Sequence, residues 1–391
     1  MAVASGEERA RLAERFVRLC EIESPSGRER EMARAVREEL EAIGLEVTED
    51  ETAAATGADC GNLIARIRGR EGVATEREPS VEAGRHSARA VMLCAHLDTV
   101  PLTDGVEVER FEGFFRNRRE AILGADNKAA VAVLVEVARR YAGAGSPVPC
   151  ELVFTTSEEI GLRGAAALDR SSLSSAFGYV FDHASPIGEL ILAAPTYYRV
   201  SAEFRGIAAH SGIRPEQGRS AISAAAKAIE AMRLGRLDDE TTANVGRIEG
   251  GIATNVVPAR CRVEAEVRSL DDAKATTRVQ EMLDALTWAA SSTDTDVDSE
   301  VEEQFRAYRI PRSDPCVQVA AAALADCGIE PVYTSTGGGS DANAFEAKGL
   351  RCLNVANGTE ANHTADERVS EHALETMLDV TIRLLERAAE A

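Results

Sequence analysis

Three short apolar runs in this 391-residue chain each lead into side chains that can bind a metal ion. The runs and their following side chains are residues 91–95 with His96 and Asp98, 152–156 with Glu158 and Glu159, and 179–181 with Asp182. Short runs of this kind are typical of buried strands in a parallel sheet, where ligands bind beyond the carboxyl ends of the strands. Imidazole nitrogens and carboxylate oxygens are ligands for zinc, manganese or cobalt ions. The pattern therefore predicts a hydrolase built around metal ions.

His96 and Asp98 lie two residues apart, so their side chains point the same way from an extended segment. Asp98 can then accept the second ring N–H of His96, an arrangement that fixes the tautomer of a metal-binding imidazole, or approach the metal from behind. The pair alone also fits an ordinary buried histidine. Asp126 likewise has two interpretations, as a metal ligand or as the N-cap of the amphipathic helix that follows it.

The adjacent carboxylates Glu158 and Glu159 repel each other unless a cation neutralises them or one of them holds a proton. One can be a metal ligand and its neighbour a general base, although a solvated acidic loop also fits. Asp182 could cap a turn, and His363 lies in a polar loop where an exposed histidine is common. Five such signals, at strand ends or in adjoining loops, seldom coincide by chance, and together they favour a metal site.

The motifs around these residues resemble those of the di-metal aminoacylase, carboxypeptidase and tripeptidase superfamily, in order along nearly the whole chain. The matching segments are CAHLDTVP at 94–101, GADNK at 124–128, SEEIG at 157–161, Asp182 and His363. Three further segments are most similar to the peptidase T-like branch: AAHSG at 208–212, TNVVP at 254–258 and GGGSDAN at 337–343.

This resemblance implies two divalent metal ions per subunit, usually zinc, with manganese and cobalt as alternatives. Asp126 and a water or hydroxide would bridge the two ions, with His96 and Asp182 completing one site and Glu159 and His363 the other. Two ions about 3.5 to 4 Å apart lower the pKa of the bridging water and polarise the scissile carbonyl. Glu158 would take the proton from that water and pass it to the departing amine, and Asp98 would orient His96.

The resemblance also implies that an inserted domain acts as a lid and that the protein forms a homodimer through this domain. His210 in this domain would donate a hydrogen bond to the oxyanion. Asn255 and Arg268 would hold the substrate, and Gly338 and Gly339 would offer backbone N–H groups to a peptide carboxylate. Each of these residues also has a structural interpretation, such as a turn residue, a solvated strand arginine or a tight turn.

The pattern of elements predicts an α/β fold with a second domain inserted into it. Capping-box spacings at Ser5 and Glu8 and at Ser26 and Glu29 predict two N-terminal helices. From residue 91 strands alternate with helices, as in a mostly parallel twisted sheet flanked by helices. Between 196 and 304 the order becomes strand, helix, strand, strand, helix, strand, which is the ferredoxin-like α+β order. We expect a catalytic metal-binding domain at 1–195 and 307–391, interrupted by a lid and dimerisation domain at 196–306.

Composition restricts the possible partners. With 44 basic and 65 acidic residues the formal net charge is −21, which repels nucleic acid and anionic lipid surfaces at long range. No stretch approaches the roughly 18 apolar residues of a membrane span, and the charged N-terminus lacks the apolar core of a signal peptide. The eight cysteines include no C-x-x-C pair and fit reduced, packed thiols. We expect a soluble cytoplasmic protein that binds neither nucleic acid nor membranes.

The expected function is hydrolysis of an amide bond in a small peptide or N-acyl amino acid, most simply by an aminopeptidase or tripeptidase. A carboxypeptidase or an N-acyl amino acid deacylase on the same scaffold remains open. A catalytically silent metal-binding protein is the alternative of another class, but no expected ligand or base is missing. A serine hydrolase using Ser340 is disfavoured, because the second glycine of G-x-S-x-G is absent.

Two features depart from the family pattern. His183 stands where the branch has an acidic or small polar residue, and it could alter the surroundings of the metals or act as a stray ligand. The segment 68–89, predicted as a surface loop, is longer than expected.

Overall fold

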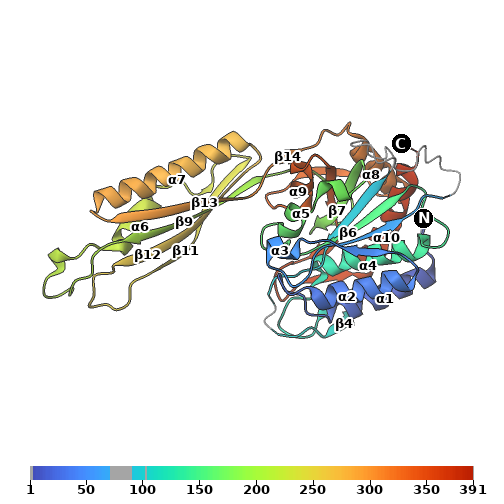
Figure 1. Cartoon of the computed structure of the whole chain (residues 1–391), viewed down its shortest axis with the longest axis horizontal. Coiled ribbons are helices and arrows are strands. Elements are labelled where there is room, and N and C mark those ends of the chain that lie inside the picture. The colour runs from blue at the N-terminus through green and yellow to red at the C-terminus, as the bar shows by residue number, and fades with distance from the viewer. Residues whose placement is uncertain (1–2, 71–89, 102–103, 391) are drawn as a thin grey trace. The chain divides into compact units, whose positions relative to one another are not determined.

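The computed structural model describes residues 3–70, 90–101 and 104–390, and Figure 1 shows its helices and strands. The chain forms two compact units. The first comprises Met1–Leu192, Arg309–Ser335 and Ser340–Ala391, and the second Ala193–Tyr308 and Thr336–Gly339. Most of the predicted loop at 68–89 lies outside the described residues.

The first unit is built on one large sheet. Its strands are β1 (Val47–Glu49), β2 (Leu63–Ile67), β3 (Val91–His96), β6 (Cys150–Thr155), β7 (Phe177–His183), β8 (Glu189–Ala194), β14 (Tyr308–Arg309), β15 (Val332–Ser335) and β16 (Arg351–Ala356). They follow the order β1-β2-β6-β3-β7-β16-β8-β14, with β15 beside β8. Strands β6, β3, β7 and β16 run parallel at the centre, whereas β1, β2 and β8 pair antiparallel. All residues of β3 and β6 are buried, as expected for central strands covered on both faces.

Helices cover this sheet, and the predicted α/β class is confirmed. Their bounds are α1 (Gly6–Cys20), α2 (Arg30–Ala42), α3 (Ala53–Thr56), α4 (Ala125–Tyr141), α5 (Arg163–Ala167), α8 (Pro315–Asp326), α9 (Asp341–Ala347) and α10 (Glu371–Ala388). Helix α4 contacts β3 and β7 of the sheet and also the helices α1, α2 and α10, and Figure 1 shows it among these elements. Its alanine and valine residues are buried on nearly every face, which suits a helix surrounded by other elements.

The predicted capping box at Ser5 and Glu8 is present, whereas the prediction of a second one at Ser26 and Glu29 is wrong. The Ser5 side chain accepts the N–H of Glu8 and the Glu8 side chain accepts that of Ser5. Helix α2, however, begins at Arg30 and has no side-chain cap. The hydroxyl of Ser26 instead donates to Asp98 Oδ2 at 2.6 Å, and Glu29 Oε1 accepts the N–H of Ser157 at 3.0 Å. These two side chains therefore hold the segments that follow β3 and β6.

A small second sheet lies in the same unit. It has the order β17-β18-β5-β4, with the bounds β4 (Val108–Phe111), β5 (Phe114–Asn117), β17 (Thr359–Glu360) and β18 (Arg368–Ser370). Strands this short carry almost no periodic signal, so the sequence did not predict them. The sheet brings the segment before α4 next to the segment before α10.

The second unit is an antiparallel sheet with two helices. Its elements are β9 (Thr196–Arg205), α6 (Ala221–Ala231), β10 (Gly235–Arg236), β11 (Thr241–Gly250), β12 (Arg260–Ser269), α7 (Asp272–Ser292) and β13 (Asp296–Phe305). The strand order β10-β11-β12-β9-β13 places the first long strand between the third and the fourth, which is the predicted ferredoxin-like arrangement. Helices α6 and α7 contact each other and both contact β9 and β12, so they cover one face of the sheet. The core between them includes Phe204, Val263, Val267 and Leu286.

No described helix is both long and apolar enough to cross a bilayer. All eight cysteines are free, and seven of them are buried, in agreement with the predicted packed thiols.

Candidate metal centre

The carboxyl ends of adjacent parallel strands bring the predicted ligands together. Strands β6, β3 and β7 lie side by side, with His96 level with Thr155. His96 ends β3, Asp182 lies near the end of β7, and Glu158 and Glu159 follow β6. Asp126 lies in the first turn of α4, and His363 lies in the loop between β17 and β18. Two groups of possible ligand atoms within 4.8 Å of one another share His96: one adds Asp126 and Glu159, and the other adds Glu158 and Asp182.

His96 is buried, and carboxylates surround its ring. Its Nε2 lies 3.3 Å from Asp126 Oδ1 and 3.6 Å from Asp182 Oδ1. Its Nδ1 lies 2.9 Å from the backbone oxygen of Asp98 and 3.5 Å from the carboxylate of the same residue. Burial alone would lower the pKa of His96, but hydrogen bonds to Asp126, Asp182 and Asp98 raise it well above its usual value. The site is therefore strongly attractive to a cation.

Asp126 lies between two histidines. Its Oδ1 faces His96, while its Oδ2 lies 3.5 Å from His363 Nε2 and accepts a hydrogen bond from Asn362 Nδ2 at 2.8 Å. Burial would raise the pKa of Asp126, but hydrogen bonds from His363 and His96 lower it. The described contacts of the Asp126 carboxylate go to His96, His363 and Asn362 and not to a backbone N–H of α4, which favours the ligand interpretation over the N-cap.

His363 also contacts Glu159, completing the second half of the cluster. Its Nε2 lies 3.1 Å from Glu159 Oε1, and hydrogen bonds to Asp126 and Glu159 raise the pKa of His363 to about 10. His363 has a φ of 64° and Ser157, beside Glu158, a φ of 55°. Left-handed backbone is unfavourable for residues other than glycine and is concentrated at functional sites.

Glu158 is a buried carboxyl group beside the other acidic side chains. Burial and the neighbouring charge of Asp182 raise the pKa of Glu158 well above its usual value. Asp98 fixes its backbone, because Asp98 Oδ1 accepts the N–H of Glu158 at 3.0 Å and Oδ2 accepts that of Glu159 at 3.1 Å. Asp98 thus holds the loop that carries the acidic pair as well as lying close to the His96 ring.

Asp341 and Glu367 are buried acids near the cluster that the sequence did not single out. Asp341 Oδ2 accepts the hydroxyl of Thr155, while its Oδ1 has no hydrogen-bond partner among the described residues. Burial, with the charges of Asp182 and Asp98, raises the pKa of Asp341 to about 7. The pKa of Glu367 also rises to about 7, because burial outweighs the backbone N–H groups that bind it. Two sequence signals could have identified them: Asp341 lies within the GGGSDAN motif, and Glu367 follows His363 by four residues.

Asp341→Asn should change how the stability of the metal-free protein depends on pH. A carboxyl group whose pKa rises from 3.8 to about 7 on folding binds more protons in the folded state between these values. Its contribution to the free energy of unfolding therefore falls as pH rises through that window. Chelator-treated wild type should lose thermal stability relative to the variant from about pH 4 to about pH 7. Parallel unfolding midpoints for the two proteins across this range would contradict the assignment.

The predicted substrate-binding residues lie in the second unit. His210 is exposed, and its Nδ1 accepts the N–H of Gly212 at 3.2 Å. Its backbone forms an isolated antiparallel β-bridge with Val256, the residue after Asn255. Arg268 lies over the Tyr197 ring and contacts Glu266 Oε2 at 3.2 Å. His210 and Asn255 therefore lie close together. The guanidinium of Arg268 already contacts Tyr197 and Glu266 within the same unit.

The two glycines predicted to bind a carboxylate have local structural roles. The N–H of Gly338 donates to Thr336 Oγ1 at 3.1 Å. A Cβ atom on Gly339 would meet the Phe305 ring at 2.2 Å, so this position requires glycine for packing. Binding a substrate carboxylate at Gly338 would require the bond to Thr336 to break.

Two other predicted roles can be compared with the structure. His183 Nε2 lies 3.5 Å from Glu189, and burial lowers the pKa of His183. The Ser340 hydroxyl accepts the N–H of Ala342 as the N-cap of α9, which explains this serine without a nucleophilic role.

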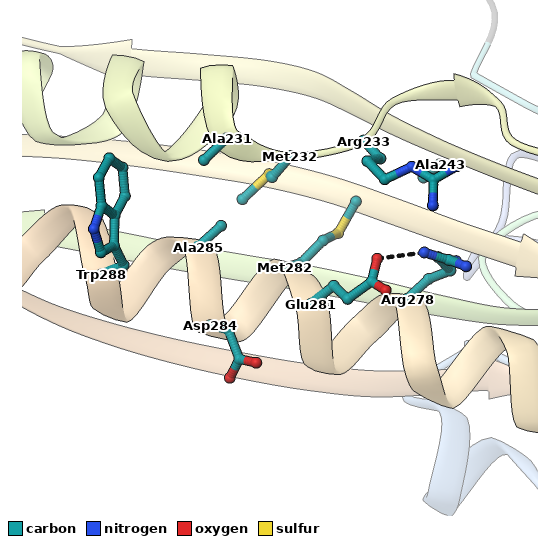
Figure 2. A pocket seen from close by; sticks show the side chains of 10 residues that line it. All are labelled: Ala231, Met232, Arg233, Ala243, Arg278, Glu281, Met282, Asp284, Ala285 and Trp288. Carbon is teal, nitrogen blue, oxygen red and sulfur yellow. Dashed lines mark hydrogen bonds and ion pairs between the residues drawn. The ribbon is translucent and has the colours of Figure 1, made fainter.

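A second group of possible ligands and a pocket in the second unit differ from the strand-end cluster in the residues that they contain. Glu29, Asp59 and Cys60 lie close together, but Glu29 binds the Ser157 backbone and Asp59 binds that of Arg30. A pocket of about 420 Å³ in the second unit lies between α6 and α7 (Figure 2). Its lining is chiefly apolar, with Met232, Met282 and Trp288, and includes neither histidine nor cysteine.

Comparisons with known proteins agree with this geometry. Residues 197–294 match the peptidase dimerisation domain of the M20 peptidases, and residues 80–188 match peptidase family M28. An uncharacterized protein of Bacillus subtilis, YqjE, is 35% identical over 97% of this chain and 99% of its own length. Aminopeptidase PepT of Bacillus cereus is 34% identical with a TM-score of 0.83, and the match covers 97% of this chain and 99% of that one.

A tripeptidase of Staphylococcus aureus has a TM-score of 0.88 and 30% identity, and the match covers 98% of this chain and 99% of the tripeptidase. The motif resemblance is thus confirmed over almost the full length. The chain belongs to the M20 metallopeptidases, in their peptidase T-like branch, and is a hydrolase acting on peptide bonds.

Proposed function

We propose that the strand-end cluster holds two divalent metal ions with Asp126 between them. The observation that carries the proposal is the placement of Asp126, whose two carboxylate oxygens face different histidines. His96 and Asp182 complete one ligand set, and Glu159 and His363 complete the other. Imidazole with carboxylate is a donor set that zinc accepts and that manganese or cobalt can also use.

Metal ions bound to these ligands would lower the pKa of a water molecule and polarise the scissile carbonyl. The side chains of the chain supply proton transfer and orientation. Glu158, held by Asp98 through its backbone N–H, accepts a proton from the attacking water and delivers it to the departing amine. The Asp98 backbone oxygen, 2.9 Å from His96 Nδ1, fixes the ring so that Nε2 faces the ions.

The reaction is removal of an amino-terminal residue from a small peptide, as in a tripeptidase. The full-length similarity to PepT of B. cereus and to the tripeptidase of S. aureus supports this substrate class. His210 and Asn255, adjacent in the second unit, are assigned to oxyanion stabilisation and substrate binding. Arg268, Gly338 and Gly339 are weaker members of this set, because each has the local contact described above.

The match to a peptidase dimerisation domain supports a homodimer formed through the second unit. A cytoplasmic location is part of the same proposal, since it suits an enzyme that trims short peptides.

A peptide panel with blocked ends tests the substrate class. A metal-loaded aminotripeptidase should hydrolyse a free tripeptide and its C-terminal amide, and should not cleave the N-acetylated tripeptide. Mass spectrometry of the products identifies the released residue, and Glu158→Gln protein, purified in parallel, controls for contaminating peptidases. Cleavage of only N-acylated compounds would instead indicate a deacylase, and release of the C-terminal residue would indicate a carboxypeptidase.

A further inference from the structure

We infer that Glu367 is a positioning residue that holds Asp126 in place for the metals. The inference rests on the proposed two-metal site, but it concerns a side chain outside the two ligand sets. Glu367 is 1% exposed and has no cationic side chain among its described hydrogen-bond partners. A carboxylate buried in this way requires another source of compensation.

Three backbone N–H groups supply part of that compensation, and the charge of the buried Lys128 adds to it. Glu367 Oε2 accepts the N–H groups of Leu123 and Gly124, each at 2.8 Å. Its Oε1 accepts the N–H of Asp126 at 2.9 Å. These donors belong to the turn that enters α4, where Gly124 has a φ of 75° and Asp126 departs from helical backbone with a ψ of 103°. One side chain therefore fixes the part of this turn that determines where the Asp126 carboxylate points.

The small sheet anchors the same turn from its other end. Asn117, the last residue of β5, donates from Nδ2 to the backbone oxygen of Ile122 at 3.0 Å. Strand β18, which begins directly after Glu367, pairs with β5, and β17 pairs with β18. The loop between β17 and β18 carries His363. The small sheet thus couples Asp126 and His363, which come from segments more than 200 residues apart and whose side chains lie 3.5 Å apart.

The chemistry of this anchor specifically requires a carboxylate. Both oxygens of Glu367 are acceptors, so together they can bind three donors. A glutamine at this position would turn one NH₂ group toward a backbone N–H, leaving at least one buried donor without an acceptor. The volume would be unchanged, so the effect of Glu367→Gln would come from the lost acceptor.

Glu151 offers a matched control in the same unit. It is 2% exposed, and its Oε2 accepts the N–H groups of Ser174 and Ser175, each at 2.9 Å. These residues precede β7 at its amino end, which is the end of the strand opposite Asp182. Glu151→Gln therefore removes a similar buried acceptor, together with the ion pair to Arg66 at 3.1 Å, without touching the turn that carries Asp126.

The test measures Zn²⁺ affinity by competition with a chromogenic chelator, together with thermal unfolding of the metal-free proteins. Glu367→Gln should bind zinc about 10- to 100-fold more weakly than wild type, as is usual when a group supporting a ligand is lost. Both Glu367→Gln and Glu151→Gln should lower the thermal unfolding midpoint of the metal-free protein. Glu151→Gln should nevertheless bind zinc as wild type does. Equal zinc affinity in wild type and Glu367→Gln would overturn the inference. If wild type itself binds no zinc, the two-metal proposal fails first.

Hydrogen exchange on metal-free wild type tests the same point without a variant. If Glu367 positions the turn in advance, the amides of Leu123, Gly124 and Asp126 should be protected before zinc is added. Protection that develops only after zinc is added would show that the metal orders the turn, and would overturn the inference even if Glu367→Gln fails to fold.

Discussion

Glu158→Gln should bind divalent metal as wild type does and lose amide hydrolysis by about 10²- to 10⁴-fold, the range usually supplied by general acid–base catalysis. Glutamine keeps the shape of the side chain but cannot accept and return a proton. The backbone N–H bond from residue 158 to Asp98 Oδ1, 3.0 Å in the native protein, does not involve the altered atoms. The loss should fall on kcat, with KM nearly unchanged, because proton transfer occurs in the transition state.

The measurement is steady-state hydrolysis of a free tripeptide by metal-loaded protein, with metal content determined on the same sample. Glu151→Gln is a suitable control, since it makes the same chemical change at a buried carboxylate near the amino end of β6, away from the carboxyl ends of the strands. A variant with wild-type kcat would remove Glu158 from proton transfer. A variant that loses both activity and metal would show that Glu158 is a ligand, as its place beside His96 and Asp182 also permits.

Asp126→Asn should release both metal ions and abolish hydrolysis. Asp126 is the one predicted ligand common to both sets, and its two oxygens lie 3.3 Å and 3.5 Å from the nitrogens of different histidines. An asparagine offers only one oxygen and no negative charge, so each ion loses charge neutralisation and one loses a donor. We expect zinc affinity to fall by more than about 100-fold, beyond the usual effect of a change outside the ligand shell.

Competition with a chromogenic chelator measures this change for each ion. Asp326→Asn is a control for the same substitution, since Asp326 pairs with Arg387 at the surface and should affect neither ion. Retention of one tightly bound ion in Asp126→Asn would mean that Asp126 belongs to a single site. Retention of both would refute the bridging arrangement.

The sequence predicted the elements that carry strong local patterns. Buried apolar runs located β3, β6 and β7, and the order of strands and helices identified the ferredoxin-like unit. The predicted ligands were recognisable because they stand directly after such strands or in recognised motifs. Residues that can bind a metal ion indicate a site when they follow parallel strands, because the carboxyl ends of these strands meet at the same edge of the sheet.

The features that were missed depend on contacts between distant segments. Glu29 matches a capping-box spacing, yet it binds Ser157, 128 residues away. Glu367 binds amides more than 240 residues before it, and β17 and β18 are too short to show a period. Asp98 was expected to receive the His96 ring, but the shorter ring contact is to its backbone oxygen, and its carboxylate binds the N–H groups of the acidic pair. Local sequence patterns do not encode such pairings.

Metal content tests the central proposal most directly. Elemental analysis of the wild-type protein, loaded with zinc and freed of loosely bound ions, should give about two zinc ions per chain. Asp126→Asn protein prepared in the same way should hold almost none. A wild-type protein that is folded, hydrolyses tripeptides and contains no divalent metal would contradict the two-metal assignment of His96, Asp126, Glu159, Asp182 and His363.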